Sequence, residues 1–342
     1  MPQDLPLTVW ILIFALATSA IWRTGVILVD ATDLIDARWN LGEAVGGAVL
    51  LAIVTNLPEV AIMVSASLRG DTSVVVGNLI GGVALQTLVL VLLDCKLKGS
   101  PPLSHRAADL VLVLEGLLVV VVLTLCIMGM QLPATVIFER ITPAPFLIAL
   151  LWLFGLWLID WASNKRPWHD EANNDAAEPP APPPQGSLQK TYWIFAIAAL
   201  ITLIAGIALE QSGAVLARAL GMNGLLFGAT FLALVTALPQ ISTGLRAIQK
   251  GDYQLAVSDI FGGNIFLPVL LLPATLIAGR AILPLAHKTD IYLAALAILL
   301  TCVYLIGLIV RSKNKCFGMG PDSLAALVLY VLGMAGLFLI EA

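Results

Sequence analysis

The chain has 342 residues, of which 59% are hydrophobic and 12% are charged, with a mean hydropathy of +0.97 and a formal net charge of −4. A soluble globule of this size could not bury so much apolar surface, so the composition excludes a soluble enzyme or binding domain and indicates an integral membrane protein. We expect the lipid bilayer to surround the chain and no nucleic acid to bind it.

Long apolar segments recur along the chain and predict membrane-spanning helices. Each reaches the roughly 20 residues that an α-helix needs to cross about 30 Å of hydrocarbon, well beyond the roughly 9–11 residues of a barrel strand. The sequence therefore predicts an all-α integral membrane protein with ten transmembrane helices. The predicted spans are 7–29, 41–68, 73–94, 107–129, 143–161, 191–209, 222–248, 255–278, 289–310 and 322–340.

A polar segment at residues 164–190 separates the first five predicted spans from the last five. It is rich in Pro, Asn, Asp and Glu, a composition that cannot build a core and favours extended polyproline geometry. We therefore predict two five-helix halves, 1–163 and 191–342, joined by a cytoplasmic linker. The alternative is that the proline-rich run docks into the aromatic groove of a partner protein.

The basic residues predict how the spans are oriented. If the N-terminus lies outside, most of the 18 Lys and Arg residues fall in the inside loops, as the positive-inside bias requires. We therefore expect a multi-pass protein of the cell membrane with both termini outside. Because each half has five predicted spans, the second half enters from the opposite face, and the two halves have inverted topology.

A repeated motif lies in the second span of each half. The run Thr55-Asn-Leu-Pro-Glu59 returns as Thr236-Ala-Leu-Pro-Gln240, and a Gly-Asp pair and a later glycine pair follow each copy at the same distance. Each copy places a proline and a polar group in an apolar segment, which favours a broken helix at an ion site near the bilayer midplane. The alternative is chance similarity between two apolar runs.

These motifs resemble the α-repeats of the cation/calcium exchanger superfamily. Residues 47–59 and 77–82 look like the first repeat, and residues 228–240 and 258–266 look like the second. The chain is identified as a divergent member, similar to sodium/calcium exchangers. The resemblance implies two inverted five-helix repeats, with a glutamate from each repeat facing the other and with hydroxyl and carbonyl oxygens completing a shell for sodium or calcium.

The two copies depart from the family pattern in charge. Glu59 keeps the first glutamate, but Gln240 stands at the position of the second. Calcium takes about six to eight oxygen ligands and gains much of its affinity from carboxylates, so we expect this site to bind calcium poorly. Thr55 and Thr236 keep the family threonines, and Asn56 replaces the serine that follows the first of them.

One aspartate suggests where a second charge is placed. Asp259 precedes Gly263 and Leu267 at a spacing of four residues, so the three share a helix face. The matching stripe in the first repeat begins at Asn78 and ends at Gln86. Because an aspartate in the bilayer core is costly, Asp259 is a candidate for the ion pathway, and the alternative is a structural partner at a helix break.

Two other readings of buried acids stay open. Glu59 is either a ligand or a group that caps the helix broken by Pro58. Glu115, within the fourth predicted span, either relays protons from the site or faces a neighbouring helix.

The sequence thus predicts a secondary active transporter that moves inorganic cations by alternating access, and not an enzyme. Calcium is the family substrate; the alternatives are a proton- or sodium-coupled antiporter of another cation and a non-transporting sensor or assembly protein. We expect no cofactor beyond the transported sodium, calcium, proton or other cation. The predicted ion ligands, of which Glu59 and Asp259 would contact the metal, are Glu59, Thr55, Asn56, Thr236, Gln240, Asp259, Asn78 and Gln86.

Overall fold

The computed structural model describes residues 5–39, 47–133, 142–164, 188–221 and 227–341. These residues form a helical bundle, and the only β contact among them is a bridge between Cys316 and Met319. Seven of their helices are long and apolar enough to span a membrane, or eight if one bent pair counts as a single span. The all-α membrane fold is therefore confirmed, whereas the count of ten and the inverted topology stay predictions.

The first half begins with one long helix and continues with a broken one. Its elements are α1 (Leu7–Trp39), α2 (Gly47–Thr55), α3 (Leu57–Arg69), α4 (Thr72–Lys96), α5 (Leu103–Ala107), α6 (Leu110–Gln131) and α7 (Pro143–Asn164). The predicted fourth span started at 107, but the structure places the short helix α5 before it and starts α6 at Leu110. Asp109 sets this start, because its carboxylate accepts from the Val111 N–H at 2.7 Å and caps the helix.

The second half has the same order with more interruptions. Its elements are α8 (Leu188–Ala219), the π-helical turn η3 (Gly228–Leu232), α10 (Ala233–Thr236), α11 (Leu238–Lys250), α12 (Tyr253–Val269), α13 (Leu271–Ala278), the 3₁₀ turn η4 (Leu283–Leu285), α14 (Lys288–Val310) and α15 (Pro321–Glu341). The predicted span 255–278 is interrupted at Leu270, after Pro268 removes a helical N–H donor. Most of the predicted linker lies outside the described residues, and its last three residues belong to α8.

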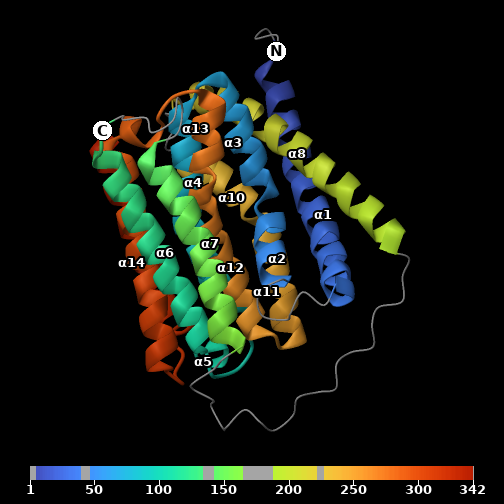
Figure 1. The fold of residues 1–342 in the computed structure, drawn as a ribbon, viewed down its shortest axis with the longest axis vertical. Helices are drawn as coiled ribbons and strands as arrows, with labels where there is room; N and C mark the ends of the chain where they lie inside the picture. Colours follow the sequence, from blue (N-terminus) through green and yellow to red (C-terminus); the bar gives the residue numbers. More distant parts are fainter. Residues whose placement is uncertain (1–4, 40–46, 134–141, 165–187, 222–226, 342) are drawn as a thin grey trace.

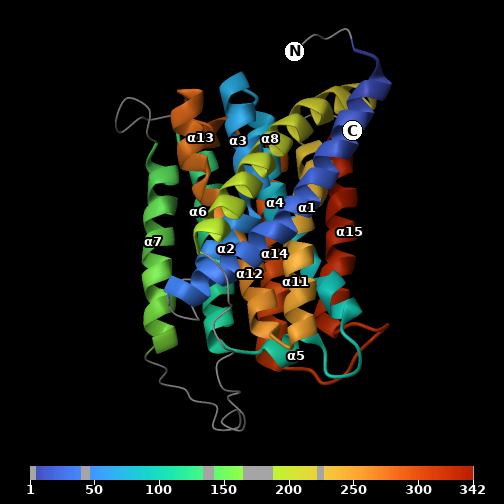
Figure 2. The same cartoon turned by 90° about the vertical axis from the view of Figure 1, so that its right-hand side faces the viewer.

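Helices α1 and α8 are much longer than their predicted spans. With 33 and 32 residues, each extends roughly 50 Å, which exceeds the roughly 30 Å of hydrocarbon, and a tilt together with polar end turns accommodates the excess. Figure 2 shows the two helices side by side, crossing the other helices obliquely. The N-terminal end of α1 and the C-terminal end of α15 lie at one end of the bundle, and the C-terminal end of α7 lies at the other (Figures 1 and 2).

The Gly-Asp pairs of the sequence repeat form the same turn in both halves. Gly70 ends α3 with φ 72° and Gly251 ends α11 with φ 82°, a left-handed conformation that suits glycine. Asp71 and Asp252 then cap α4 and α12, accepting from backbone N–H groups at 3.2 and 2.9 Å. The repeated residues therefore produce repeated local structure.

Helices α4 and α12 pack against each other in the middle of the bundle. Almost every residue of α4 from Val74 to Asp94 is buried, which explains why this helix is apolar on all faces. Each of the two helices follows a broken helix, α2–α3 or α10–α11. The polar residues of both breaks therefore meet the centre of the bundle rather than lipid.

Candidate cation-binding site

The first helix break lies at Asn56, between α2 and α3. Pro58 follows within the first turn of α3 and offers no N–H, so the helix cannot run continuously through this point. The Asn56 amide nitrogen instead donates to the Ala52 carbonyl at 2.6 Å. This geometry turns Thr55, Asn56 and Glu59 into the interior, where none is more than 1% exposed.

The second break lies at Ala237, between α10 and α11, and Pro239 takes the role of Pro58. The helix bends by 42° at this point. Thr236 and Gln240 flank the break and are fully buried. The prediction of a broken helix in each repeat is therefore confirmed by the backbone.

Gln86 of α4 joins the first break to its neighbours. Its amide nitrogen donates to Glu59 Oε1 at 3.1 Å and to Asn56 Oδ1 at 2.9 Å. Gln240 fits best with its amide turned so that the nitrogen donates to the Thr236 carbonyl at 3.1 Å and the oxygen accepts from Gln86 at 3.1 Å. Side chains from both halves thus form one buried polar cluster around Glu59.

The two predicted threonines lie at the edge of this cluster, one at each helix break. The Thr55 hydroxyl donates to Asp259 Oδ1 of α12 at 3.2 Å. The Thr236 hydroxyl donates to the Leu232 and Ala233 carbonyls at 3.0 and 3.2 Å, and the Thr236 carbonyl accepts from Gln240. The Thr55 hydroxyl and the Asn56 amide also share the Ala52 carbonyl as acceptor, which places Asp259 beside the cluster, and the described residues show no hydrogen bond between the Asp259 and Glu59 carboxylates.

Gly263 explains how α12 approaches the cluster. A Cβ atom at this position would lie 2.8 Å from the Asn56 amide nitrogen and 3.2 Å from Gln86 Oε1. At the equivalent position in α4, a Cβ on Gly82 would meet only the Leu267 side chain, at 3.2 Å. The helix face formed by Asp259, Gly263 and Leu267 on α12 therefore has an aspartate at one end and, at the other, an apolar leucine that packs over Gly82.

Several buried oxygens in and beside the cluster have no hydrogen-bond partner among the described residues. Buried polar atoms are normally paired, so a set of unpaired oxygens from both halves is what an incoming cation or proton would satisfy. These oxygens are Glu59 Oε2, Gln86 Oε1, Asp259 Oδ2 and Asn264 Oδ1. No group of three or more His, Cys, Asp or Glu comes together in the described part of the chain, so the cluster is poor in charge.

Asn78 is the predicted residue that the structure leaves apart. It is fully buried in α4, but neither its amide nitrogen nor its oxygen bonds to another described residue. It is related to Asp259 by the repeat, and only the aspartate has a threonine partner. The structure therefore brings together seven of the eight predicted ligands.

Two polar contacts were not part of the predicted ligand set. The Asn264 amide donates to the Thr87 hydroxyl at 3.0 Å and ties α12 to α4, with both side chains fully buried. Their counterparts in the other repeat are Val83 and Pro268, so the symmetry argument gave no signal for them. Glu115 accepts from the Ser258 hydroxyl at 2.8 Å, which places a third buried carboxylate beside the residue that precedes Asp259.

Comparison with known proteins decides the family. The sequence model described as "Sodium/calcium exchanger protein" matches residues 9–161 and 190–339. The chain belongs to the sodium/calcium exchanger family. It is therefore a membrane cation antiporter by family and not an enzyme.

Relatives of this exchanger-family chain include two bacterial membrane proteins. CaxA of Alkalimonas amylolytica, which is named as a candidate antiporter, is 29% identical over 285 residues, 82% of this chain and 85% of CaxA. The inner membrane protein YrbG of Escherichia coli strain K12 is 27% identical over 267 residues, 77% of this chain and 78% of YrbG.

Solved exchanger structures share the fold. The H⁺/Ca²⁺ exchanger CAX superposes with a TM-score of 0.71 at 12% identity, covering 97% of this chain and 82% of CAX. The sodium-calcium exchanger NCX_Mj superposes with a TM-score of 0.62 at 18% identity, covering 96% of this chain and 99% of NCX_Mj. At these identities the likeness establishes the exchanger fold alone.

Proposed function

We propose that this exchanger-family protein is a secondary active transporter in which a proton or monovalent cation competes with a second cation for the cluster around Glu59. The observation that carries the proposal is the set of unpaired, buried oxygens at the meeting point of two broken helices. Half-helix ends and unwound backbone beside a buried carboxylate are what cation transporters use to bind and release ions near the bilayer midplane. Alternating access would then expose this cluster to each side in turn.

The chemistry of the ligands favours tighter binding of a cation other than calcium. Two carboxylates, three amides and two hydroxyls offer less negative charge than a calcium site normally does. Solved relatives are named as exchangers of protons, sodium and calcium, so all three stay within the family's chemistry. Glu59 is the residue that would carry the proton if protons are coupled.

The hydrogen bonds of Gln240 support a special role for the second repeat. In its favoured orientation this side chain donates to the Thr236 and Ala237 carbonyls at 3.1 and 3.3 Å and presents its oxygen to the cluster. A glutamate at position 240 would place a carboxylate oxygen where the Gln240 amide nitrogen lies. Oxygen cannot donate to the two carbonyls, so a proton or cation would have to lie between the carboxylate and the carbonyls. Gln240 therefore holds the break together without needing an ion.

For the cell, the proposal places this transporter in the cell membrane with both termini outside. No cofactor is required, because the transported cations are the only ligands that the cluster would hold. The partners are inorganic cations and the surrounding lipid.

The test is cation flux in proteoliposomes that contain the purified protein. Uptake of sodium, potassium, calcium and magnesium is measured against an imposed pH or sodium gradient for the wild type and for Glu59→Gln. We expect Glu59→Gln to lower flux about ten- to hundredfold, because a hydrogen bond or contact to a charged group is worth about 1.5–3 kcal/mol.

Asp252→Asn is the matched control for this test. It removes one negative charge from an exposed helix cap, and asparagine caps helices as well as aspartate does, so flux should be unchanged. Flux that survives unaltered in Glu59→Gln would refute the proposal.

A further inference from the structure

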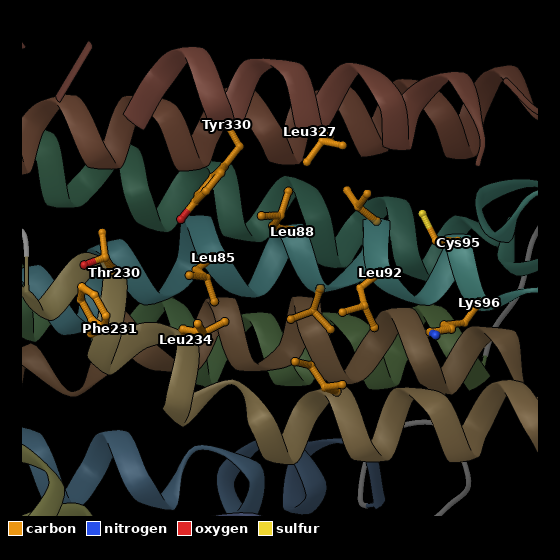
Figure 3. Close-up of a pocket in the computed structure, with 13 residues that line it drawn as sticks. Leu85, Leu88, Leu92, Cys95, Lys96, Thr230, Phe231, Leu234, Leu327 and Tyr330 are labelled. Atoms are coloured by element: carbon orange, nitrogen blue, oxygen red, sulfur yellow. The ribbon is translucent and has the colours of Figure 1, made fainter. Parts of the chain in front are cut away.

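A deep apolar groove lies on the lipid-facing side of the bundle, between α4, the η3–α10–α11 segment and α15. Its volume is about 590 Å³. Leu85, Val89 and Val91 of α4 form a buried floor, and Leu92 and Leu234 at its mouth are 38% and 53% exposed. Figure 3 shows Lys96 at one end of the groove and Tyr330, Thr230 and Phe231 at the other.

The length of the groove matches one leaflet of a bilayer. From Leu85 to Lys96 the α4 backbone rises roughly 17 Å at about 1.5 Å per residue. Half of a hydrocarbon core of about 30 Å is about 15 Å. Leu85 precedes the site residue Gln86, so the inner end lies at the depth of the polar cluster and Lys96 lies near the membrane surface.

The charge at the outer end identifies the kind of occupant. Lys96 is an exposed basic residue at the mouth of an otherwise apolar groove, and Lys98 follows it two residues later. The neighbouring acid, Asp94, is fully buried and already accepts from the backbone N–H groups of Leu103 and Gly320. A basic side chain at the surface attracts a phosphate headgroup, while the apolar groove excludes a polar ligand.

We propose that this groove binds one acyl chain of an anionic glycerophospholipid, with the lipid phosphate at Lys96. The chain would fill the groove from the membrane surface to the depth of the cation cluster. Lipid tails surround the protein in any case, so burial of an acyl chain brings no hydrophobic gain in a bilayer, and the preference comes from the shape of the groove and from the charge on Lys96.

The bound chain would also contact the helix that leads into the second break. Thr230, Phe231 and Leu234 line the groove, and Thr236 of the cation cluster follows Leu234 by two residues. The π-helical turn η3 is a local irregularity of the kind that occurs at functional sites. A lipid in the groove therefore supports the wall from which Thr236 and Gln240 reach the cluster.

The experiment counts lipids bound to the purified full chain by native mass spectrometry after exchange into detergent with added phosphatidylglycerol or phosphatidylethanolamine. We expect the wild type to retain one phosphatidylglycerol, at least about fivefold in preference to phosphatidylethanolamine. Leu92→Trp should abolish this retention by filling the groove, and Leu117→Trp, at an exposed leucine on α6 away from the groove, should not. Size-exclusion chromatography checks that both variants fold.

Lys96→Gln tests the headgroup contact with a milder change. We expect it to reduce the preference for phosphatidylglycerol to nearly equal binding of the two lipids, whereas Lys98→Gln should leave the preference in place. Retention by Leu92→Trp equal to that of the wild type would overturn the groove assignment. Equal binding of both lipids by the wild type, or a lipid-free dimer that covers the groove, would overturn the proposal, and none of these results depends on transport.

Discussion

The two helix breaks share a backbone design but differ in their side chains. At the first break, Asn56 and Glu59 both accept from the Gln86 amide and form a hydrogen-bonded cluster with it. At the second break, Ala237 adds no polar group and Gln240 offers one uncharged amide. The repeat therefore preserves the broken-helix backbone of the site in both halves. The negative charge of the site is not repeated, because it comes from Glu59 in the first half and Asp259 in α12.

The largest expected effect concerns the equivalent positions Asp259 and Asn78. Asp259→Asn removes a buried charge that accepts from the Thr55 hydroxyl, so cation affinity should fall about ten- to hundredfold. Asn78→Ser removes a side chain with no described partner and should change affinity less than about threefold. Cation-dependent thermal stabilisation in detergent measures both. Equal losses in the two variants would mean that the halves contribute alike.

A second comparison uses the equivalent glycines Gly263 and Gly82. Gly263→Ala forces a methyl group toward two buried amides, and such overpacking costs about 1–3 kcal/mol. Gly82→Ala meets only the flexible end of the Leu267 side chain, at 3.2 Å, and no polar group. We expect the first variant to bind cations about tenfold more weakly and the second to bind normally, by the same thermal assay. A weaker effect at 263 than at 82 would contradict this description of the cluster.

The smallest expected effect tests the shared backbone. Gly70→Ala and Gly251→Ala each place a side chain on a left-handed residue, which costs roughly 1–2 kcal/mol. Because the two turns have nearly the same φ, the two variants should lower the unfolding temperature by similar amounts, with cation affinity unchanged. Unequal shifts would show that the surroundings, such as Arg280 beside Gly70, outweigh the turn itself.

Local signals in the sequence predicted the parts of the fold that local chemistry determines. Pro58 and Pro239 remove helical N–H groups, so the positions of both breaks followed from the sequence. The full length of α1 and α8 did not follow from the sequence. Their apolar stretches continue into polar turns, which hydropathy alone excludes from a membrane span. The interruption at Leu270 was missed although Pro268 marked it.

The candidate site was predictable only where the repeat supplied a pattern. Glu59, Thr55 and Gln86 follow from the motif, and the structure places them in hydrogen-bonding clusters. The contact between Asn264 and Thr87 depends on how α12 is rotated against α4, which is a property of tertiary packing that no motif contains. The separation of Asn78 from the cluster has the same origin.

The most direct test of the charge asymmetry is calcium binding to Gln240→Glu by isothermal titration calorimetry in detergent. The variant restores the second carboxylate, and carboxylate count strongly raises calcium affinity. We predict at least about tenfold tighter calcium binding than in the wild type, and loss of that gain when Glu59→Gln is added. Wild-type binding as tight as that of Gln240→Glu would contradict the claim that Gln240 sets the ion preference of this site.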